Sequence, residues 1–451
     1  MNNVFSFSDT VFAPATAVIA SGVCVIRISG PDAKSAISAL VAPKNFSFRP
    51  RFFELCFLRD PKSHEIIDHA LVVFFPAPYS FTGEDIVELH CHGSIAVVRW
   101  LLRSLAAIEG LRFAEAGEFS RRAFVNGKLD LAAAEGLADL IEAETAAQAK
   151  QALRQMSGAL SSLYEGWRNI LIKCMAALEA YIDFPDEEIP ESVLQEINER
   201  VRTLQSSLEN HLEDSRCGER LRDGFFITIL GAPNAGKSSL LNALAKRDLA
   251  IVSNQAGTTR DILEARLDIN GYPFILQDTA GLRETDNEIE QEGIRRAKRA
   301  ASDADLCLFL FDASCFSPND PLVSSLNENC IVVFTKFDLA PNFTPPQLPV
   351  KNIFMISLLD DSWPVSNLSN YFSELAAEIF SLPEAPAITR ERHRKIASDA
   401  VLLLEQFFQH PPLEIAAEIL RSAAMTLGRI SGKIDMEDVL DELFSRFCIG
   451  K

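Results

Sequence analysis

The chain has no excess of positive charge. Its 451 residues include 43 Lys and Arg against 62 Asp and Glu, so the formal net charge is −19 and the pI is near 4.9. Proteins that hold nucleic acid through phosphate contacts need clustered basic side chains. A bare phosphate-binding surface is therefore not expected, and any role with nucleic acid has to be local or shared with a partner.

Long apolar runs and paired cysteines are also missing. No run reaches the roughly 18 apolar residues of a membrane-spanning helix. The apolar stretch 13–28 contains Pro14, follows Asp9 and has no preceding Lys or Arg, which argues against a secretory signal. The nine cysteines form no C-x-x-C pair, as is typical of a reducing compartment. We predict a cytoplasmic protein with no membrane segment.

The texture of the sequence changes along the chain and predicts a multidomain α/β protein. Residues 1–120 mix β-branched runs with helical patches, which indicates an α+β domain. Residues 121–219 and 381–451 are rich in Ala, Leu, Glu and Gln at helical spacing, so we expect them to pack as one discontinuous all-α domain. In residues 220–380 strands alternate with helices, which predicts an inserted parallel α/β domain.

A phosphate-binding loop follows the first predicted strand of the inserted domain. Residues 231–238 read GAPNAGKS and match G-x-x-x-x-G-K-S between an apolar strand and a helix. The backbone N–H groups of such a loop close around phosphate oxygens, Lys237 reaches the terminal phosphates and Ser238 offers a hydroxyl to Mg²⁺. The expected nucleotide contacts are Asn234, Ala235, Gly236, Lys237, Ser238 and Ser239.

Two further motifs follow later strands. Asp278, Thr279, Ala280 and Gly281 place a carboxylate near the metal and a glycine N–H near a γ-phosphate. Thr335, Lys336 and Asp338 form a T-K-x-D motif, in which the Asp can accept both guanine N–H donors. Either motif alone reads as a strand-ending turn; together, in this order, they indicate a GTPase. Thr335 stands where Asn is usual, residues 357–359 read Ser-Leu-Leu where a base-contacting loop is expected, and Leu282 replaces the water-orienting Gln.

These motifs resemble the translation-factor-like class of GTPases. By that resemblance residues 256–261, AGTTRD, are the first switch, and Thr259 is the second Mg²⁺ ligand. The first switch and the residues before it then add Ser253, Asn254, Gln255, Ala256, Gly257, Thr258 and Thr259 to the nucleotide and cation contacts.

Motifs near both ends of the chain are more specific. They are RISG (27–30), FTGED (81–85), AGEFSRRAF (116–124), GKLDLAAAE (127–135), FPDEEI (184–189) and the C-terminal FCIGK (447–451). In this order they resemble the MnmE (TrmE) family of tRNA-modification GTPases along essentially the whole chain. The resemblance implies an N-terminal domain that binds tetrahydrofolate and dimerises, a helical domain in two segments, and an inserted Ras-like G domain.

The resemblance also implies an activity. Family members add a carboxymethylaminomethyl group to C5 of the wobble uridine of certain tRNAs, with the FAD-dependent partner MnmG in a heterotetramer. They use 5-formyl- or 5,10-methylene-tetrahydrofolate, and K⁺-stimulated hydrolysis of GTP with Mg²⁺ drives a conformational change. Such a chain is expected to bind tRNA weakly alone and tightly only in the complex.

Residue roles carried over from the family begin with the folate contacts, Arg27, Glu88, Lys128 and Lys451. Cations suit the glutamate tail of folate and a carboxylate suits the pterin donors. An ion pair between neighbouring strands is the alternative for Arg27 and Glu88. The loop before RISG lacks the Pro-Gly-Arg-Gly text usual in the family.

The resemblance assigns further roles in the G domain and at the C-terminus. K⁺ would be held by Asn234, Ser253, Gln255 and Thr258, in place of an arginine finger. Glu290 would position the attacking water, and Cys448 would lie near the folate as a catalytic or a structural thiol.

Other functions remain open from the residues alone. A ribosome-assembly GTPase that switches on RNA would suit the G motifs, although a basic C-terminal RNA module is missing. A GTP-gated scaffold with an inactive folate site would suit the altered loop before RISG. His90, Cys91 and His92 resemble a metal cluster, but in a strand the two histidines would share one face and the cysteine would take the other.

Overall fold

The computed structural model describes residues 7–41, 46–183, 192–213, 215–247, 263–278, 304–360, 362, 364–380, 386–409, 411–432, 440, 443–445, 447 and 450. The chain divides into two compact units. The first consists of Met1–Ala138, Gln155–Pro185 and Pro412–Lys451, and the second of Asp139–Arg154 and Asp186–Pro411. The domain boundaries given above stay predictions.

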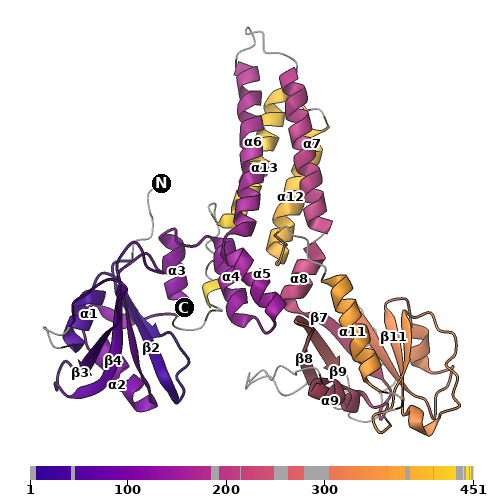
Figure 1. The fold of residues 1–451 in the computed structure, drawn as a ribbon. Helices are drawn as coiled ribbons and strands as arrows, with labels where there is room; N and C mark the ends of the chain where they lie inside the picture. The colour runs from indigo at the N-terminus through magenta and orange to yellow at the C-terminus, as the bar shows by residue number, and fades with distance from the viewer. Residues whose placement is uncertain are drawn as a thin grey trace, which may run out of the picture. The chain divides into compact units, whose positions relative to one another are not determined.

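The first unit contains a six-stranded sheet in the order β3-β4-β5-β2-β1-β6 (Figure 1). All its neighbouring strands are antiparallel except β1 and β6. The strands are β1 (Thr10–Pro14), β2 (Ser21–Ser29), β3 (Glu54–Arg59), β4 (Ile66–Phe75), β5 (Ile86–Gly93) and β6 (Leu111–Phe113).

Two helices cover one face of this sheet. Alternate residues of β2, namely Cys24, Ile26 and Ile28, are buried beneath α1 (Ala33–Leu40) and α2 (Ile95–Ala106). Because side chains alternate across a strand, Arg27 belongs to the opposite face. This opposite face, which we call the open face, also keeps exposed apolar side chains: Val23, Leu55, Phe57 and Leu71.

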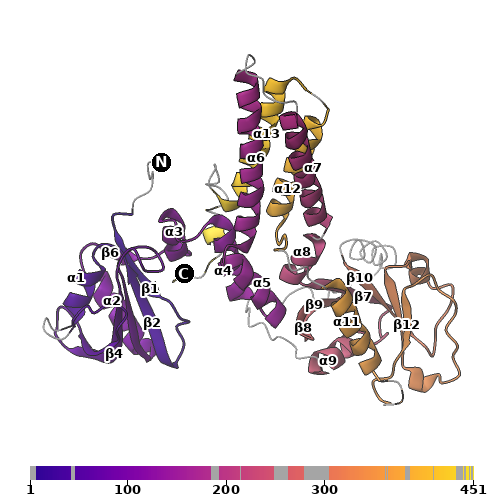
Figure 2. The same cartoon turned by 45° about the horizontal axis from the view of Figure 1, so that its top comes forward.

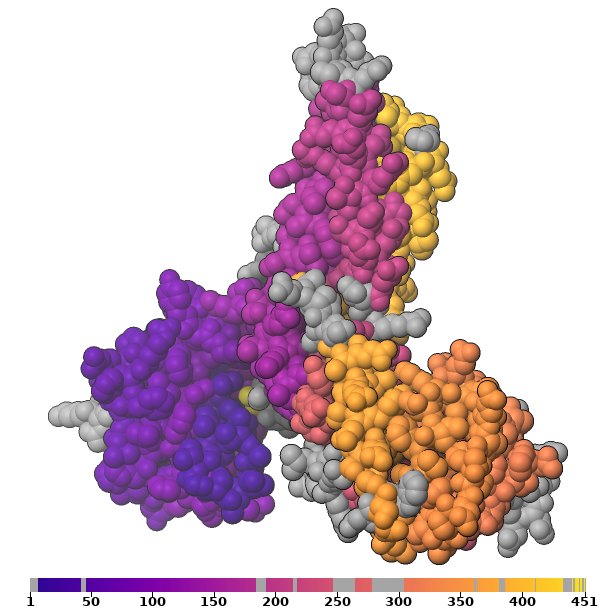
Figure 3. Space-filling view, turned by 45° about the vertical axis from the view of Figure 1, so that its right-hand side comes forward, coloured from indigo at the N-terminus to yellow at the C-terminus, as the bar shows by residue number. Residues whose placement is uncertain are grey.

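The rest of the first unit is helical. Its helices are α3 (Glu118–Val125), most of α4 (Leu131–Glu142), α6 (Ala159–Asp183), α13 (Leu413–Gly428) and the short η4 (Arg429–Ser431). α6 and α13 are far apart in sequence but run side by side in Figures 1 and 2, and Arg421 of α13 contacts Glu179 of α6 at 2.6 Å. Figure 3 shows the chain in space-filling form, with α13 among the yellow residues. The two segments predicted to be helical therefore do pack together.

The second unit contains a six-stranded sheet in the order β12-β11-β10-β7-β9-β8. Its strands are β7 (Phe225–Gly231), β8 (Leu263–Ile269), β9 (Tyr272–Asp278), β10 (Leu306–Asp312), β11 (Cys330–Thr335) and β12 (Asn352–Met355). Its helices are α5 (Ala146–Met156, mostly in this unit), α7 (Ser192–Glu213), α8 (Ser215–Asp223), α9 (Lys237–Arg247), α11 (Ser366–Ile379) and α12 (Glu391–Phe407), with the short η2 (Pro321–Ser325) and η3 (Phe337–Leu339).

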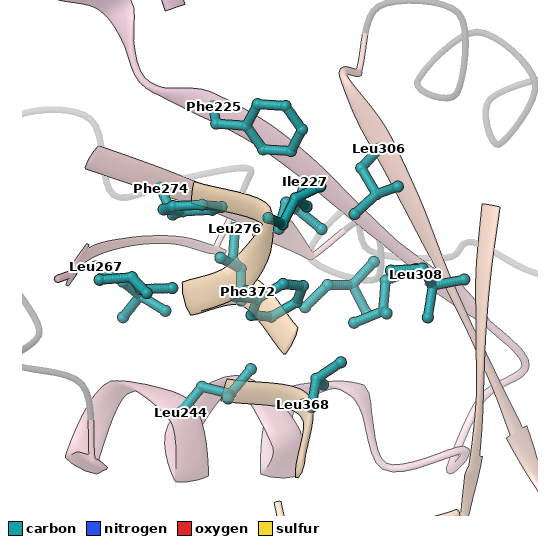
Figure 4. Close-up of a cluster of buried hydrophobic side chains, with 14 of the residues drawn as sticks. Phe225, Ile227, Leu244, Leu267, Phe274, Leu276, Leu306, Leu308, Leu368 and Phe372 are labelled. Carbon is teal, nitrogen blue, oxygen red and sulfur yellow. The ribbon is translucent and has the colours of Figure 1, made fainter. Parts of the chain in front are cut away.

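The core of this α/β part lies between the sheet and two helices (Figure 4). Phe274 and Leu276 of β9 pack with Leu244 of α9 and with Leu368 and Phe372 of α11. The central strands β7, β10 and β11 read as apolar runs because both faces of the sheet are covered there. The α/β fold predicted from the alternation of strands and helices is confirmed.

One strand differs from the expected all-parallel sheet. β8 pairs antiparallel with β9 at the edge, through a turn at Asn270 and Gly271 that both have positive φ, 55° and 87°. Asn-Gly is the dipeptide that two-residue hairpin turns prefer. The Asn270–Gly271 dipeptide is therefore the signal in the sequence for this hairpin, which the alternation of strands and helices does not reveal.

Candidate functional site

The first candidate site is the loop between β7 and α9. Asn234 and Gly236 have positive φ, 65° and 92°, a conformation that Asn tolerates and Gly adopts freely. Gly231 leaves no room for a side chain, since a Cβ there would lie 2.5 Å from the carbonyl oxygen of Leu310. The loop therefore has the backbone shape that lets N–H groups turn toward a phosphate at the N-terminus of α9.

Lys237 lies at the start of α9 and is almost completely buried. Its Nζ donates hydrogen bonds to the carbonyl oxygens of Gly231 and Ala232, at 2.8 and 3.0 Å. The ammonium group thus bridges the beginning of the loop to its end. Ser238 and Ser239, the next residues, are exposed.

Thr335, at the end of β11, ties the guanine motif to this loop. Its hydroxyl donates to the carbonyl oxygen of Ala235 at 2.8 Å, with the carbonyl oxygen of Phe311 at 3.3 Å. Thr335 is 2% exposed, so its only O–H donor is used within the protein. This contact brings the guanine motif against the phosphate loop, as a single nucleotide site requires.

Asp338 is oriented by Ser357, which was not among the predicted nucleotide contacts. Its Oδ1 accepts a hydrogen bond from the Ser357 hydroxyl at 2.6 Å, and Ser357 Oγ in turn accepts from the N–H groups of Leu359 and Asp360. The hydrogen bond orients the carboxylate of Asp338 through Oδ1 and does not use the second oxygen, Oδ2. A serine just after a strand that follows the T-K-x-D motif is the signal that could have found Ser357.

Lys336 contacts a carboxylate at the end of the neighbouring strand. Its Nζ lies 2.7 Å from Oδ2 of Asp312, and this hydrogen bond raises the pKa of Lys336. Burial alone would raise the pKa of Asp312, but the bonds from Lys336 and Ser314 outweigh it and lower that pKa. Both groups are therefore charged at neutral pH.

The donors present fit Mg²⁺ and a nucleotide. Ser238 is the second residue of α9, and Asp278 is paired in the strand register with Ile229, two residues before the loop begins. Hydroxyl and carboxylate oxygens are the ligands that Mg²⁺ prefers. The remaining predicted G-domain residues lie outside the described part of the chain: Ser253, Asn254, Gln255, Ala256, Gly257, Thr258, Thr259, Thr279, Ala280, Gly281 and Glu290.

The second candidate site lies on the open face of the N-terminal sheet. Arg27 of β2 and Glu88 of β5 are partners in the register, and their side chains form an ion pair at 2.8 Å. The Arg27 guanidinium also lies 5.4 Å from the ring of Phe81 and 5.6 Å from that of Phe119. This site joins a charged pair to aromatic side chains.

His90, which was not predicted as a site residue, adjoins this pair. Its Nε2 is 3.4 Å from Oε2 of Glu88, yet this buried atom has no hydrogen-bond partner. Such an atom is usually satisfied by water or a ligand. Arg27, Glu88 and His90 thus offer a cation, a carboxylate and a ring nitrogen to a polar ligand. Over the described residues, no three His, Cys, Asp or Glu side chains gather as a metal site.

The close surroundings of two glycines show which other segments of the first unit lie near this sheet. A Cβ on Gly83 would lie 3.2 Å from Cε of Lys128, so the Lys128 side chain lies against the FTGED loop. A Cβ on Gly450 would lie 1.9 Å from the carbonyl oxygen of Pro14, so the chain near its C-terminus lies against the end of β1. Lys451 and Cys448 lie outside the described residues.

A buried charge cluster supports the FTGED loop. Arg122 of α3 is fully buried and contacts Asp9, Glu84 and Glu118 at 2.8 to 3.1 Å. Burial would raise the pKa of Glu118, but hydrogen bonds from Arg112, Glu115 and Arg122 outweigh it and lower that pKa. Glu84 also accepts a hydrogen bond from the hydroxyl of Ser29, the last residue of β2, two positions after Arg27. The cluster therefore fixes α3, the loop and β2 together.

Comparisons with known proteins agree with this arrangement. The family model described as the GTP-binding protein TrmE N-terminus matches residues 10–128, and the MnmE helical domain matches residues 131–448. The tRNA modification GTPase MnmE of Paramagnetospirillum magneticum is 48% identical over 98% of this chain and 100% of that protein. That of Rickettsia bellii is 46% identical over the same shares.

Solved structures add only a distant likeness. The G domain of the T. maritima FeoB iron transporter is 22% identical, covers 34% of this chain and 96% of that chain, and has a TM-score of 0.24, which supports no conclusion. Within the described residues, no helix has the length and apolar character needed to span a bilayer. Both family models and the full-length relatives agree, and the chain belongs to the MnmE (TrmE) family.

Proposed function

We propose that this chain is a cytoplasmic, GTP-hydrolysing tRNA-modification enzyme. With the FAD-dependent partner MnmG it would add a carboxymethylaminomethyl group to C5 of the wobble uridine of certain tRNAs. The observation that carries the GTPase part is the Thr335–Ala235 hydrogen bond, which joins a phosphate loop to a guanine motif. The tRNA part rests on full-length relatives that are named tRNA modification GTPases.

The chain's own residues suit GTP binding. The loop N–H groups and Lys237 would hold the phosphates, and Asp338, oriented by Ser357, would accept the guanine N–H donors. Ser238, Thr259 and Asp278 would hold Mg²⁺, which neutralises charge on the phosphates when bound. Lys237 now donates to loop carbonyls and would turn from them to phosphate oxygens, a stronger charge-assisted contact.

Hydrolysis without an arginine finger needs another cation and another group to orient water. We assign K⁺ to Asn234, Ser253, Gln255 and Thr258, and the water to Glu290. The positive φ of Asn234 supports the first assignment, because it presents this side chain at the exposed tip of the loop. GTP turnover should be faster in K⁺ than in Na⁺ and should fall in Glu290→Ala. Equal rates in all four cases would contradict this mechanism.

The N-terminal domain would bind 5-formyl- or 5,10-methylene-tetrahydrofolate as one-carbon donor. Arg27, Lys128 and Lys451 would meet the glutamate tail, and Glu88 the pterin donors. Support comes from the unsatisfied His90 Nε2 beside Glu88 and from the placement of Gly450, next to Lys451, against β1. Cys448 would lie close to the one-carbon unit.

Partners follow from the surface of the same domain. The open face leaves Val23 and Leu55 more than half exposed, at 56% and 59%, and apolar patches of this kind favour association. We assign this face to a homodimer, which with MnmG would form the heterotetramer. The net charge of −19 supports weak, salt-sensitive tRNA binding by the chain alone.

Ribonucleoside analysis tests the whole assignment. tRNA from a deletion strain should regain the modified wobble uridine when the strain carries this gene, but not when it carries the Lys237→Ala variant at equal expression. If the wild-type gene leaves the wobble uridines unmodified although the protein accumulates, the tRNA function is wrong.

A further inference from the structure

The β8–β9 hairpin occupies a special place in the G domain. The predicted first switch, residues 256–261, ends just before β8, and the D-T-A-G motif begins at Asp278, the last residue of β9. The hairpin therefore joins the two segments whose conformations are expected to depend on the γ-phosphate. A change at either segment acts directly on one end of this hairpin.

The opposite end of the hairpin is docked on a helical segment. The carbonyl oxygen of Gly271, in the hairpin turn, accepts a hydrogen bond from the N–H of Ala147 at 3.2 Å. Arg266 of β8 donates to Oε2 of Glu144 at 3.1 Å. Ala147 also packs against the G-domain core. These contacts come from the loop between α4 and α5 and from the first turn of α5.

The same helical segment holds the two connections of the α/β part. Oδ1 of Asp139 accepts from Nε of Arg222 at 2.9 Å and from Nη2 of Arg390 at 2.6 Å. Arg222 lies in α8, just before β7, and Arg390 is the residue that precedes α12. Gln148 donates to the carbonyl oxygen of Arg222 at 3.0 Å. One segment thus contacts the beginning, the end and the hairpin turn of this part.

Residues 139–148 also have a rigid continuation. Asp139 is in the last turns of α4, a continuous helix that begins at Leu131. A helix transmits a displacement along its axis better than a loop does, because its backbone hydrogen bonds keep its shape. A shift of the hairpin would therefore reach residues well beyond the contact.

We propose that residues 139–148 are a receiver segment that carries the nucleotide state of the G domain from the β8–β9 hairpin to the helices. Glu144 is the group that senses the hairpin, through Arg266, and Asp139 keeps the two connections in place. This inference rests on the proposed GTPase function and concerns its regulation.

The alternative is a static clamp that holds the G domain in place. The receiver and the clamp predict different results when the contact between Arg266 and Glu144 is lost. The side chains of Arg266 and Glu144 are 44% and 22% exposed, and ion pairs near the surface contribute little to stability. Glu144→Gln should therefore fold and hydrolyse GTP within about threefold of the wild-type rate, but a receiver without this contact no longer follows the hairpin.

Hydrogen–deuterium exchange of the full-length protein tests the receiver. Peptides from residues 139–156 are compared with GDP and with a nonhydrolysable imido analogue of GTP, each with Mg²⁺. Wild type should show a difference in deuterium uptake between the two nucleotides. Glu144→Gln and Arg266→Gln should lose at least half of it, and the exchanged pair Glu144→Arg with Arg266→Glu should regain it.

A matched control is Glu196→Gln, which removes the exposed Glu196–Arg200 pair of α7 and should leave the difference intact. No nucleotide-dependent uptake in wild type, or the full difference in Glu144→Gln, overturns the inference. Failure of wild type to hydrolyse GTP would instead contradict the proposed function.

Discussion

The two candidate sites are built in different ways. The phosphate loop is one stretch of eight residues, and its geometry is set by backbone: positive φ at Asn234 and Gly236, and a glycine where a Cβ would strike Leu310. The N-terminal site is made of side chains from β2, β5, the FTGED loop and α3. A backbone site is visible as a motif, whereas a side-chain site becomes visible only after folding.

The two regions also differ in charge. Residues 1–130 carry 13 Lys and Arg and 13 Asp and Glu, so the whole net charge of −19 belongs to the residues after position 130. The N-terminal site therefore lies in a neutral region, where a folate polyanion or an RNA phosphate meets no long-range repulsion from its own domain.

The largest expected effect separates the two sites. Lys237→Ala removes the cation that serves the phosphates, so GTP turnover should fall by at least about 100-fold. Folate affinity should not change, because Lys237 belongs to the phosphate loop of the other unit and not to the N-terminal sheet. Phosphate release and calorimetry measure the two properties. The exposed lysine variant Lys351→Ala should behave as wild type, and a Lys237→Ala protein that kept its turnover would remove the loop from the mechanism.

The converse experiment is Arg27→Gln. It should weaken 5-formyltetrahydrofolate binding by about 10- to 100-fold, because Glu88 then stays without its cation beside the ligand. GTP turnover should stay at the wild-type level. Isothermal titration measures the affinity, and Lys34→Gln, which breaks the more exposed pair with Asp85, is the control. Unchanged affinity would favour the interpretation of Arg27 and Glu88 as an ion pair between strands.

The difference between the sites explains how far the sequence could be read. The α/β order, the helical segments and the motifs at residues 231–238 and 335–338 follow from local patterns, because strand runs and loop glycines leave marks within a few residues. The family and its N-terminal site came from a resemblance. His90 was considered only as a metal ligand and Ser357 only as part of a base-contacting loop. Their observed roles depend on Glu88 and Asp338, which strand pairing or a distant turn brings close.

The antiparallel β8 shows a further limit. Its residues alternate between apolar and polar after the first switch, and with the Asn270–Gly271 turn they indicate an antiparallel edge strand, which the order of strands and helices alone does not show. The contact of that turn with Ala147 joins residues more than a hundred positions apart. No local pattern predicts such a contact.

A smaller effect is expected from the pH dependence of stability, which concerns the buried charge cluster of the first unit. The pKa of Glu118 is lowered in the folded protein, so its stabilising effect is complete above its ordinary pKa of 4.5 and is lost as the pH falls through the lowered value. Glu118→Gln should cost about 1.5 kcal/mol at pH 7, as expected for bonds to charged groups, and less below pH 4.5. Urea unfolding, followed for the first unit at pH 7 and at a pH below 4.5, measures the cost of the substitution. Glu179→Gln, in an exposed pair of the same unit, should show almost no cost, and an equal cost of Glu118→Gln at both pH values would contradict the charged role.

The smallest effect concerns Thr335, where the guanine motif departs from the usual Asn. Thr335→Val keeps the shape but leaves the Ala235 carbonyl without its donor, so the KM for GTP should rise about fivefold, the equivalent of one hydrogen bond. The value of kcat should hardly change, because the contact is the same in the ground and transition states. Thr335→Ser keeps the hydroxyl and should restore the KM. Since the Thr335 donor is used within the protein, the preference for GTP over ITP should be the same in all three proteins; a changed preference would mean that Thr335 itself reads the base.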